Sequence, residues 1–340
     1  MQNVYSGTDA EYEQLRGACG LVDYTGVGLI RVGGAEAAAF LGQVSTRSVD
    51  FLLEGQISAS LLLKQDGTVL AEALIHCRDA DYLVEVWPAQ AGAAVEHLTA
   101  AAAGGSHDVT VQDVSQEFRV FGIEGPQSPA IAQKFLPFPI SSLSYASFIT
   151  STWRDDLELL VSRSGVTGEY GYKLHVPAAA GDGLREHLLS LGASEVGLDA
   201  VDICRMEMRF ANLEREADGA TPFEVGLQWM VDFGHAFTGQ EALTEQWKAG
   251  LDRRPVCWLA ADGLEAAPER GTPLTIDGEQ VGAVTHAVYS PRLSRVIGTA
   301  RVESEVAAAG IDFTLDELNH PVQTVAAPFL VATSFGVPLE

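Results

Sequence analysis

A mostly apolar run over residues 67–77 has the length and composition of a β-strand, and it follows a turn signal, Lys64-Gln-Asp-Gly67. Apolar runs opened by Asp-Gly are typical of a strand with a hairpin before it. Because side chains alternate between the two faces of a strand, Glu72, Leu74 and His76 would share one face. This strand would therefore present a carboxylate and an imidazole on the same side.

A glutamate and a histidine on a mostly apolar strand have two interpretations. Burial raises the pKa of a carboxylate and lowers that of an imidazole, so Glu72 and His76 could act as a general acid and base. Alternatively, the strand lies at the edge of a sheet and its polar face meets water. The residues of this strand alone leave both interpretations open.

The pattern around this strand predicts helices and strands in alternation. Residues 8–19 open with a capping residue, carry acids in the first turn and end before Gly20, as a helix does. The other elements predicted in this third are strands over 28–32 and 82–87, the second an antiparallel partner of 67–77, and helices over 35–41 and 89–102.

The second third of the chain repeats this order. Strand-helix-strand units joined by hairpins indicate a second α+β domain of similar size. The predicted elements are strands over 118–123, 146–152, 157–162 and 172–176, helices over 128–135 and 183–191, and a glycine-punctuated loop over 163–171.

The composition changes after a predicted helix over 198–210. Short strands separated by Gly, Pro, Asp and Asn are typical of a small β-barrel or sandwich. We therefore predict an α+β fold with domains over 1–115, 116–238 and 239–340, in which the first two can exchange segments. The predicted barrel strands are 255–260, 272–276, 280–288, 296–302 and 322–326.

The composition also limits the class of partner. The chain has 340 residues, of which 47% are hydrophobic, enough for two or three globular domains. Its 21 Lys and Arg against 46 Asp and Glu give a net charge of −25, which repels nucleic acid and anionic membrane surfaces. No secretory signal or membrane-spanning run is present. These features predict a soluble cytoplasmic protein.

The cysteines give no sign of a metal site. Cys19, Cys77, Cys204 and Cys257 lie far apart and form no Cys-x-x-Cys pair, which argues against a zinc knuckle or a disulfide scaffold. Each is expected to be a small buried apolar residue. The sequence predicts no metal.

Five ordered stretches resemble one family. The most specific is Ser162-Arg-Ser-Gly-Val-Thr-Gly-Glu-Tyr-Gly-Tyr172, followed by Thr221-Pro-Phe-Glu-Val-Gly-Leu-Gln-Trp229 and Phe237-Thr-Gly-Gln-Glu-Ala-Leu243. Residues 197–207 and 282–293 match two further blocks in the same order. Together they resemble the aminomethyltransferase family, which comprises the T-protein of the glycine cleavage system and its relatives among folate-dependent demethylases and folate-binding proteins.

This resemblance implies a three-domain cloverleaf in which two ferredoxin-like α+β domains and a C-terminal β-barrel surround a central channel. It also implies that tetrahydrofolate binds in that channel and exchanges a one-carbon unit with a small molecule at the pterin N5 region. The catalytic acidic residue of the family falls on Glu72, and no carrier protein is indicated. We expect His76, on the same face of the strand, to assist Glu72. A fixed carboxylate there can stabilise developing positive charge or deliver a proton.

Several ligand-binding positions depart from the family pattern. The pterin-contacting glutamate falls on Lys173, so the amidine edge of the pterin would meet an ammonium donor in place of a carboxylate acceptor. Family tyrosines fall on Ala59, His76 and Val166, and a family arginine falls on Val201. Each lost buried partner typically costs about 1–3 kcal/mol. The cofactor- or substrate-binding positions are Val27, Ala59, Leu74, Trp87, Val166, Lys173, Val201 and Arg205.

The charged residues of this set have alternatives of their own. Lys173 is either solvated or a pocket cation that pairs with Glu72 or holds an anionic substrate. Arg205 and Glu207 are expected to pair with neighbours in a structural role. His286 and Arg292 are expected to be structural or rim residues of the barrel.

Three hypotheses for the function follow. The first is a folate-dependent methyl- or aminomethyl-transferase that uses Glu72 and His76. The second is a folate-independent enzyme on the same scaffold that uses Glu72, His76 and Lys173. The third is a non-catalytic folate-binding protein, which ranks last because the Lys-Cys-x-x-Gly-Gln-Glu run of such relatives is replaced by Arg209-Phe-Ala-Asn-Leu-Glu-Arg-Glu216.

Overall fold

The computed structural model describes residues 1–154 and 156–339, which form two compact units. The first unit contains Met1–Val201, Met230–Gln240 and the segment that begins at Ala332. The second contains Asp202–Trp229 and Glu241–Val331. Helix α6 (Leu198–Met208) crosses the division between them.

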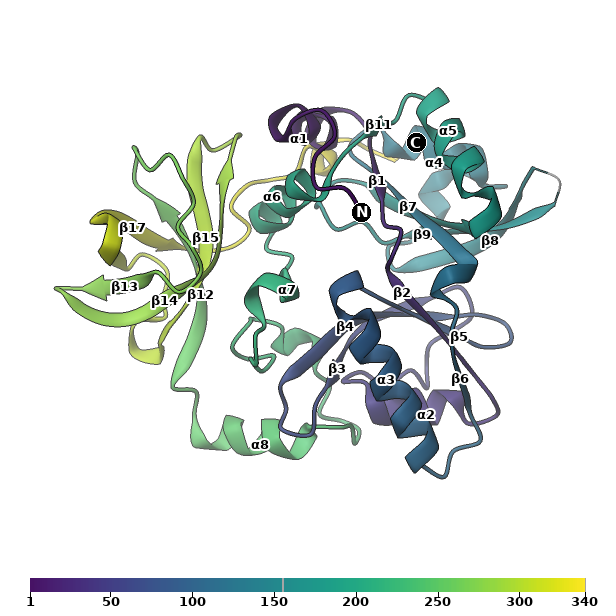
Figure 1. The fold of residues 1–340 in the computed structure, drawn as a ribbon, viewed down its shortest axis with the longest axis horizontal. Helices are drawn as coiled ribbons and strands as arrows, with labels where there is room; N and C mark the ends of the chain where they lie inside the picture. Colours follow the sequence, from purple (N-terminus) through teal and green to yellow (C-terminus); the bar gives the residue numbers. More distant parts are fainter. Residues whose placement is uncertain (155, 340) are drawn as a thin grey trace. The chain divides into compact units, whose positions relative to one another are not determined.

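Five antiparallel strands form the first sheet of unit one, in the order β3-β4-β5-β2-β6 (Figure 1). Helices α2 (Ala37–Val44) and α3 (Pro88–Gly104) pack on one face, where Ala71, Ala73 and Ile75 of β4 join a buried apolar cluster. The strands are β2 (Gly28–Gly33), β3 (Ile57–Leu63), β4 (Val69–Cys77), β5 (Tyr82–Val86) and β6 (Thr110–Asp113).

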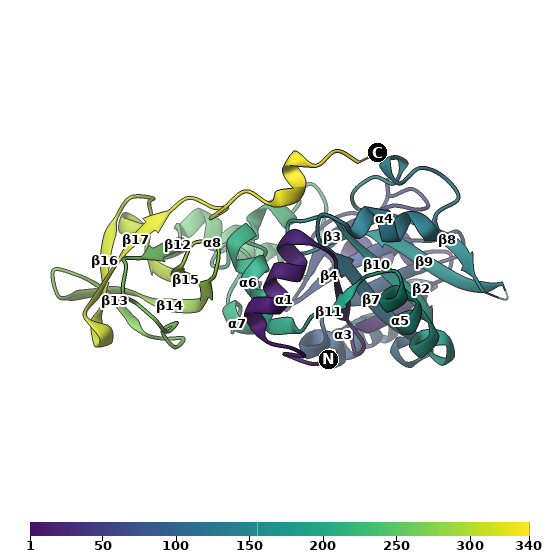
Figure 2. The same ribbon diagram turned by 90° about the horizontal axis from the view of Figure 1, so that it is seen from above.

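Six strands form the second sheet of unit one, in the order β11-β1-β7-β10-β9-β8. Helices α4 (Ser128–Ala132) and α5 (Gly181–Ser190) cover one face of it, as Figures 1 and 2 show. Strand β1 comes from the N-terminal part of the chain, so this sheet combines distant segments. The strands are β1 (Gly20–Asp23), β7 (Phe118–Glu124), β8 (Ser147–Trp153), β9 (Leu157–Arg163), β10 (Gly171–Pro177) and β11 (Ser194–Glu195).

The helix-free faces of the two sheets meet. On β10, alternation sends Tyr172 and Leu174 into the apolar core under the helices, and it sends Lys173 and His175 to the opposite face. The His175 ring lies 5.7 Å from the ring of His76 on β4, centroid to centroid. The His76 end of the polar face of β4 is therefore enclosed between two sheets, whereas Glu72 on the same face is half-buried.

Two buried glutamates fix the glycine loop, residues 163–171. Glu124 on β7 accepts hydrogen bonds from the backbone N–H groups of Val166 and Thr167, both at 3.0 Å. Glu169 forms an ion pair at 3.0 Å with Arg16 of α1 (Thr8–Gly17) and accepts from the backbone N–H of Ser334 at 2.7 Å. The loop is thereby tied to both ends of the chain.

The second unit is built around a closed six-stranded barrel, in the order β12-β15-β14-β13-β16-β17. Trp258 is fully buried in its core. The barrel strands are β12 (Arg253–Ala260), β13 (Pro273–Ile276), β14 (Glu279–Ser290), β15 (Arg295–Glu303), β16 (Asp312–Leu315) and β17 (His320–Val325), and the helices of this part are α7 (Leu213–Glu216) and α8 (Gln240–Ala249).

The predicted α+β class with a C-terminal barrel is confirmed, and so is the hairpin before β4. The edge-strand alternative is wrong, because β4 pairs with β3 on one side and β5 on the other. The sequence pattern missed β1, β3, β6, β11 and β16. Among the described residues, no helix has the length and hydropathy needed to cross a bilayer.

Glu11 provides a test of how the N-terminus is held. Its carboxylate accepts hydrogen bonds from the backbone N–H groups of Tyr5, Gly7 and Gly197 at 2.6, 3.1 and 2.7 Å. Burial raises the pKa of Glu11, but these backbone donors outweigh burial and hold the pKa below its usual value. Its contribution to stability is therefore present above the unfolded-state pKa, about 4.3, and is lost as the pH falls through the folded-state pKa.

We expect Glu11→Gln to lower the free energy of unfolding by about 1–3 kcal/mol at pH 7, because one backbone donor would face an amide NH₂. Urea unfolding from pH 7 to pH 3 should show this difference shrinking below about pH 4. Glu13→Gln, at an exposed position of the same helix, should stay within about 0.5 kcal/mol of the parent. A difference independent of pH would contradict the assignment.

Candidate functional site

Glu72 lies on the face of β4 that points away from the helices, and it is half-buried. The indole Nε1 of Trp87 donates a hydrogen bond to Glu72 Oε2 at 3.2 Å. The backbone N–H of Glu72 donates to Oε1 of Gln90 on α3 at 3.0 Å. The carboxylate is thus oriented by a neighbouring aromatic side chain while it keeps contact with solvent.

A second carboxylate, Glu85, occupies the next strand on the same face. It lies opposite Leu74 in the β4–β5 ladder and is 3% exposed. The ammonium of Lys173, also 3% exposed, donates to Glu85 Oε1, and His175 Nε2 lies 2.8 Å from Oε2. Burial raises the pKa of Glu85, but the Lys173 charge and the His175 hydrogen bond outweigh burial and hold it well below its usual range.

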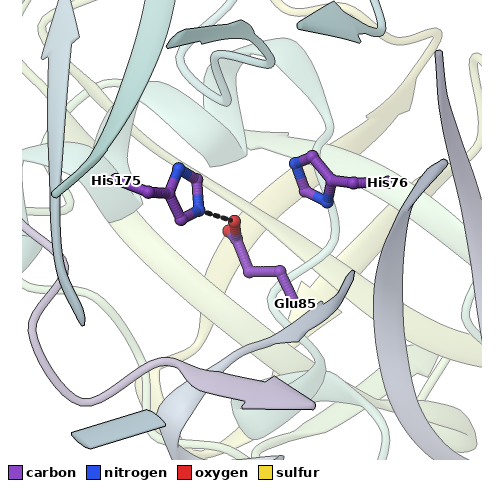
Figure 3. A group of neighbouring side chains, drawn as sticks. All are labelled: His76, Glu85 and His175. Atoms are coloured by element: carbon purple, nitrogen blue, oxygen red, sulfur yellow. Dashed lines mark hydrogen bonds and ion pairs between the residues drawn. The ribbon is translucent and has the colours of Figure 1, made fainter. Parts of the chain in front are cut away.

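His76 completes this buried group, as Figure 3 shows with its ring and that of His175 on either side of the Glu85 carboxylate. His76 Nδ1 lies 3.2 Å from the carbonyl oxygen of Leu83, and Nε2 has no hydrogen-bond partner among the described residues. Burial lowers the pKa of His76 to about 4, and Glu85 offsets this only in part. The ring is therefore neutral at pH 7.

Aromatic rings surround the Lys173 ammonium. Its Nζ lies 5.3 Å from the ring centroid of Tyr24 and 5.7 Å from that of Trp87. Such contacts contribute about 2 kcal/mol or more when they are desolvated. The hydroxyl of Tyr24 lies 3.2 Å from Glu124 Oε1, so the same aromatic residue links this layer to the glycine loop.

The two carboxylates differ in what they can do. Glu85 is neutralised by Lys173 and enclosed, so it links the two sheets and is not exposed to a substrate. Glu72 has one hydrogen-bonded side-chain partner and partial exposure, so it can approach a reacting group. A carboxylate in such a position can stabilise a developing cation or transfer a proton.

The structure brings some of the predicted site residues together. Glu72, Trp87 and Lys173 are linked by the hydrogen bond and the cation–π contact described above. Leu74 shares the face of Glu72, and Ala59 on β3 lies opposite Leu74 in the ladder. His76 also shares this face, but its nitrogens point to backbone carbonyls and to the Glu85 group.

The other predicted positions lie on other elements of the fold. Val27 is buried in the turn before β2, and Val166 lies in the glycine loop with its N–H bound to Glu124. Val201 is buried on α6, and Arg205, on the same helix, donates to the carbonyl oxygen of Ala211. This contact accords with the structural role expected for Arg205.

Two further expectations concern the second unit. His286 Nε2 lies 2.8 Å from Asp202 Oδ2, and Ser290 donates to Glu207 Oε1 at 2.5 Å. Glu207 therefore has a polar neighbour, as expected. His286 links the barrel to the middle of α6 within this unit. Both contacts are structural in character.

Two of the three sequence interpretations of Lys173 need correction. It is neither solvated nor paired with Glu72, because its ammonium is buried against Glu85. Sequence reasoning missed Glu85 as a functional residue. The available signal was a lone glutamate in the otherwise apolar strand Tyr82–Val86, at a position that alternation puts on the face of Leu83. A charge there requires a partner, and Lys173 is 88 residues away in sequence.

Family models and relatives that are similar in sequence all point to one protein family. A family model described as the GCVT N-terminal domain matches residues 1–235, and one described as the glycine cleavage T-protein C-terminal barrel domain matches residues 253–330. A protein named aminomethyltransferase from Rubrobacter xylanophilus is 30% identical over 96% of this chain and 87% of its own length. Another of that name, from Halothermothrix orenii, is 31% identical over 96% and 92%.

A solved structure has the same fold. The crystal structure of glycine cleavage system aminomethyltransferase T from Bartonella henselae matches 97% of this chain and 91% of its own with a TM-score of 0.88. Its sequence identity is 22%, so this match supports the fold alone.

The buried ion pair gives a prediction for stability. Lys173→Met should lower the free energy of unfolding by about 3–5 kcal/mol, because it leaves the Glu85 carboxylate buried without its cation. Adding Glu85→Gln should recover more than half of that loss. Chemical denaturation of the single and double variants measures both effects.

A matched control is the exposed Lys64, whose replacement by Met should change the free energy by less than about 0.5 kcal/mol. Equal losses in the Lys173→Met single variant and the double variant would show that the pair is not coupled.

Proposed function

This chain belongs to the glycine cleavage T-protein family of aminomethyltransferase-like one-carbon transferases, and from that premise we propose that it transfers a methyl, methylene or aminomethyl group from a small-molecule donor to tetrahydrofolate. The family models cover both the α+β part and the barrel. The proposal assigns the chemistry to the face of β4 that carries Glu72.

The observation that supports this proposal best is the position of Glu72. It is a half-buried carboxylate, oriented by the Trp87 indole, on the strand where the family resemblance expects the catalytic acidic residue. Transfer of a one-carbon unit from nitrogen, sulfur or oxygen develops positive charge on the donor or needs a proton delivered. A fixed anion beside the reacting carbon serves either need.

The Lys173–Glu85 pair bears on how the pterin is bound. Lys173 stands where the resemblance expects the pterin-contacting glutamate, but its charge is balanced by Glu85 within the protein. The pair removes a free ammonium from the site without restoring an exposed carboxylate acceptor. We therefore expect tetrahydrofolate to bind through its other polar groups and its ring face, with Trp87 as one aromatic neighbour.

The same pair supports a second candidate function. With no exposed carboxylate at the expected pterin contact, the scaffold could act on another small molecule without folate, with Glu72 as the acid or base. His76 and Lys173 would then support the site indirectly, because both are fully enclosed. The two candidates differ in whether reduced folate binds.

Titration calorimetry with tetrahydrofolate separates them. We expect one equivalent to bind with a measurable heat and to raise the melting temperature, since a ligand that binds only the folded state stabilises it. Absence of both heat and stabilisation would remove the folate-dependent proposal and leave the second candidate.

Glu72→Gln tests the catalytic assignment. This variant should lose about 10²–10³-fold in kcat while tetrahydrofolate affinity changes by less than a few fold, since the amide keeps the Trp87 hydrogen bond but not the charge. Chromatography of folate products after incubation with N-, S- and O-methyl donors measures the rate. Glu96→Gln, at an exposed position of α3, should keep full activity. Retained turnover in Glu72→Gln would remove this residue from the mechanism.

A further inference from the structure

Three buried side chains from three strands converge in the layer between the two sheets. They are His76 on β4, Glu85 on β5 and His175 on β10, none more than 3% exposed. One nitrogen or oxygen of each lies within 4.8 Å of the corresponding atoms of the other two. Figure 3 shows the two imidazole rings on either side of the carboxylate.

We propose that this His76–Glu85–His175 cluster binds one divalent transition-metal ion of the Zn²⁺ type. Two imidazoles and a carboxylate form a donor set that suits zinc and its first-row neighbours, in contrast to the all-oxygen sets of Mg²⁺ and Ca²⁺. A zinc ion lies about 2.0–2.2 Å from such ligands. The ligand atoms around a bound zinc ion are therefore roughly 3–3.5 Å apart. Side-chain rotations that move these atoms by about 1 Å would close the cluster around an ion.

His76 is already arranged as a ligand. Its Nδ1 lies 3.3 and 3.2 Å from the carbonyl oxygens of Leu74 and Leu83, two acceptors, so this nitrogen carries the ring proton. The lone pair is then on Nε2, which is buried and has no hydrogen-bond partner among the described residues. A metal-binding histidine typically donates its other N–H to a carbonyl or carboxylate in this manner.

Glu85 and His175 supply the other two donors. The Lys173 ammonium occupies Oε1 of Glu85, so Oε2 is the oxygen available to the ion. His175 Nε2 lies 2.8 Å from this Oε2. A bound metal ion would lie between Nε2 and Oε2, with the ring proton of His175 on Nδ1, which has no hydrogen-bond partner among the described residues.

Charge limits the affinity of the site. The charges of Lys173 and Glu85 sum to zero, so a divalent ion adds two positive charges to a layer with almost no solvent contact. A water or hydroxide as the fourth ligand lowers this cost. Loss of the Lys173 charge lowers it further and leaves Glu85 in need of a cation, so metal and Lys173 compete for the same carboxylate.

The first experiment uses the full chain, treated with a chelator and then titrated with Zn²⁺ and, separately, Co²⁺. We expect one equivalent of Zn²⁺ to bind by calorimetry and by elemental analysis after gel filtration, and Co²⁺ to give the visible absorption of a low-coordinate nitrogen and oxygen site. Mg²⁺ should neither bind nor displace Co²⁺. Absence of stoichiometric binding, or an absorption typical of hydrated cobalt, would overturn the proposal.

Variants then locate the ion. His76→Ala and His175→Ala should each weaken Zn²⁺ binding at least tenfold and abolish the Co²⁺ absorption. His187→Ala is the matched control, because His187 packs between the aromatic rings of Phe135 and Trp153 in the same unit but lies outside the cluster. Unchanged binding in His76→Ala would overturn the assignment, and the cobalt spectrum of the parent remains decisive if a variant fails to fold.

Lys173→Met gives the sharpest comparison, because a charge-balanced structural network and a metal site predict opposite results. If the cluster binds metal, this variant should bind Zn²⁺ at least tenfold more tightly than the parent, and Zn²⁺ should restore most of its lost melting temperature. If the cluster is only a network of hydrogen bonds, Zn²⁺ should leave the variant as unstable as before, and the proposal is then wrong.

Discussion

The structure of the first unit depends on the neutralisation of charge between two sheets that bury their other faces under helices. Glu85 and Lys173 come from different sheets, and each is almost fully enclosed. An unpaired charge in such a place would cost about 3–5 kcal/mol, a large part of the stability of a domain, which favours the register of the two sheets that joins these side chains. Four aromatic or imidazole side chains lie around the pair: His175, His76, Tyr24 and Trp87. The ion pair determines where the aromatic residues near Glu72 can lie.

Two glutamates on neighbouring strands show how environment assigns roles. Glu72 and Glu85 point to the same side of the sheet, on adjacent strands. Glu85 faces the ammonium and imidazole of the opposing sheet, whereas Glu72 meets the edge of an indole and retains solvent contact. The first is therefore a fixed structural anion, and the second keeps the freedom that chemistry requires. The indole hydrogen bond links the two roles, because Trp87 contacts both Glu72 and the Lys173 ammonium.

Local pattern was enough to predict the hairpin, the face shared by Glu72 and His76, and a C-terminal domain of short strands, because these follow from turn residues and from the two-residue period of a strand. The family resemblance was needed to predict that this domain is a barrel. The partner of Lys173 could not be predicted in this way. Its distance along the chain from Glu85 is large, and only the packing of two sheets brings the pair together. The edge-strand interpretation of β4 failed for a related reason, since strand β3, with Ser58 and Ser60 among its apolar residues, was not recognised as a partner.

The hydrogen bonds from the Ser334 segment to Glu169 have a consequence for the synthesis of the protein. The glycine loop is completed by residues that follow the whole barrel in sequence, so the first unit is not finished when its own sheets have left the ribosome. Domains generally fold as they emerge, N-terminal first. Here one loop of the early unit must stay unanchored until the segment that follows the barrel has been translated, so the fold of the first unit is completed only after synthesis of the second.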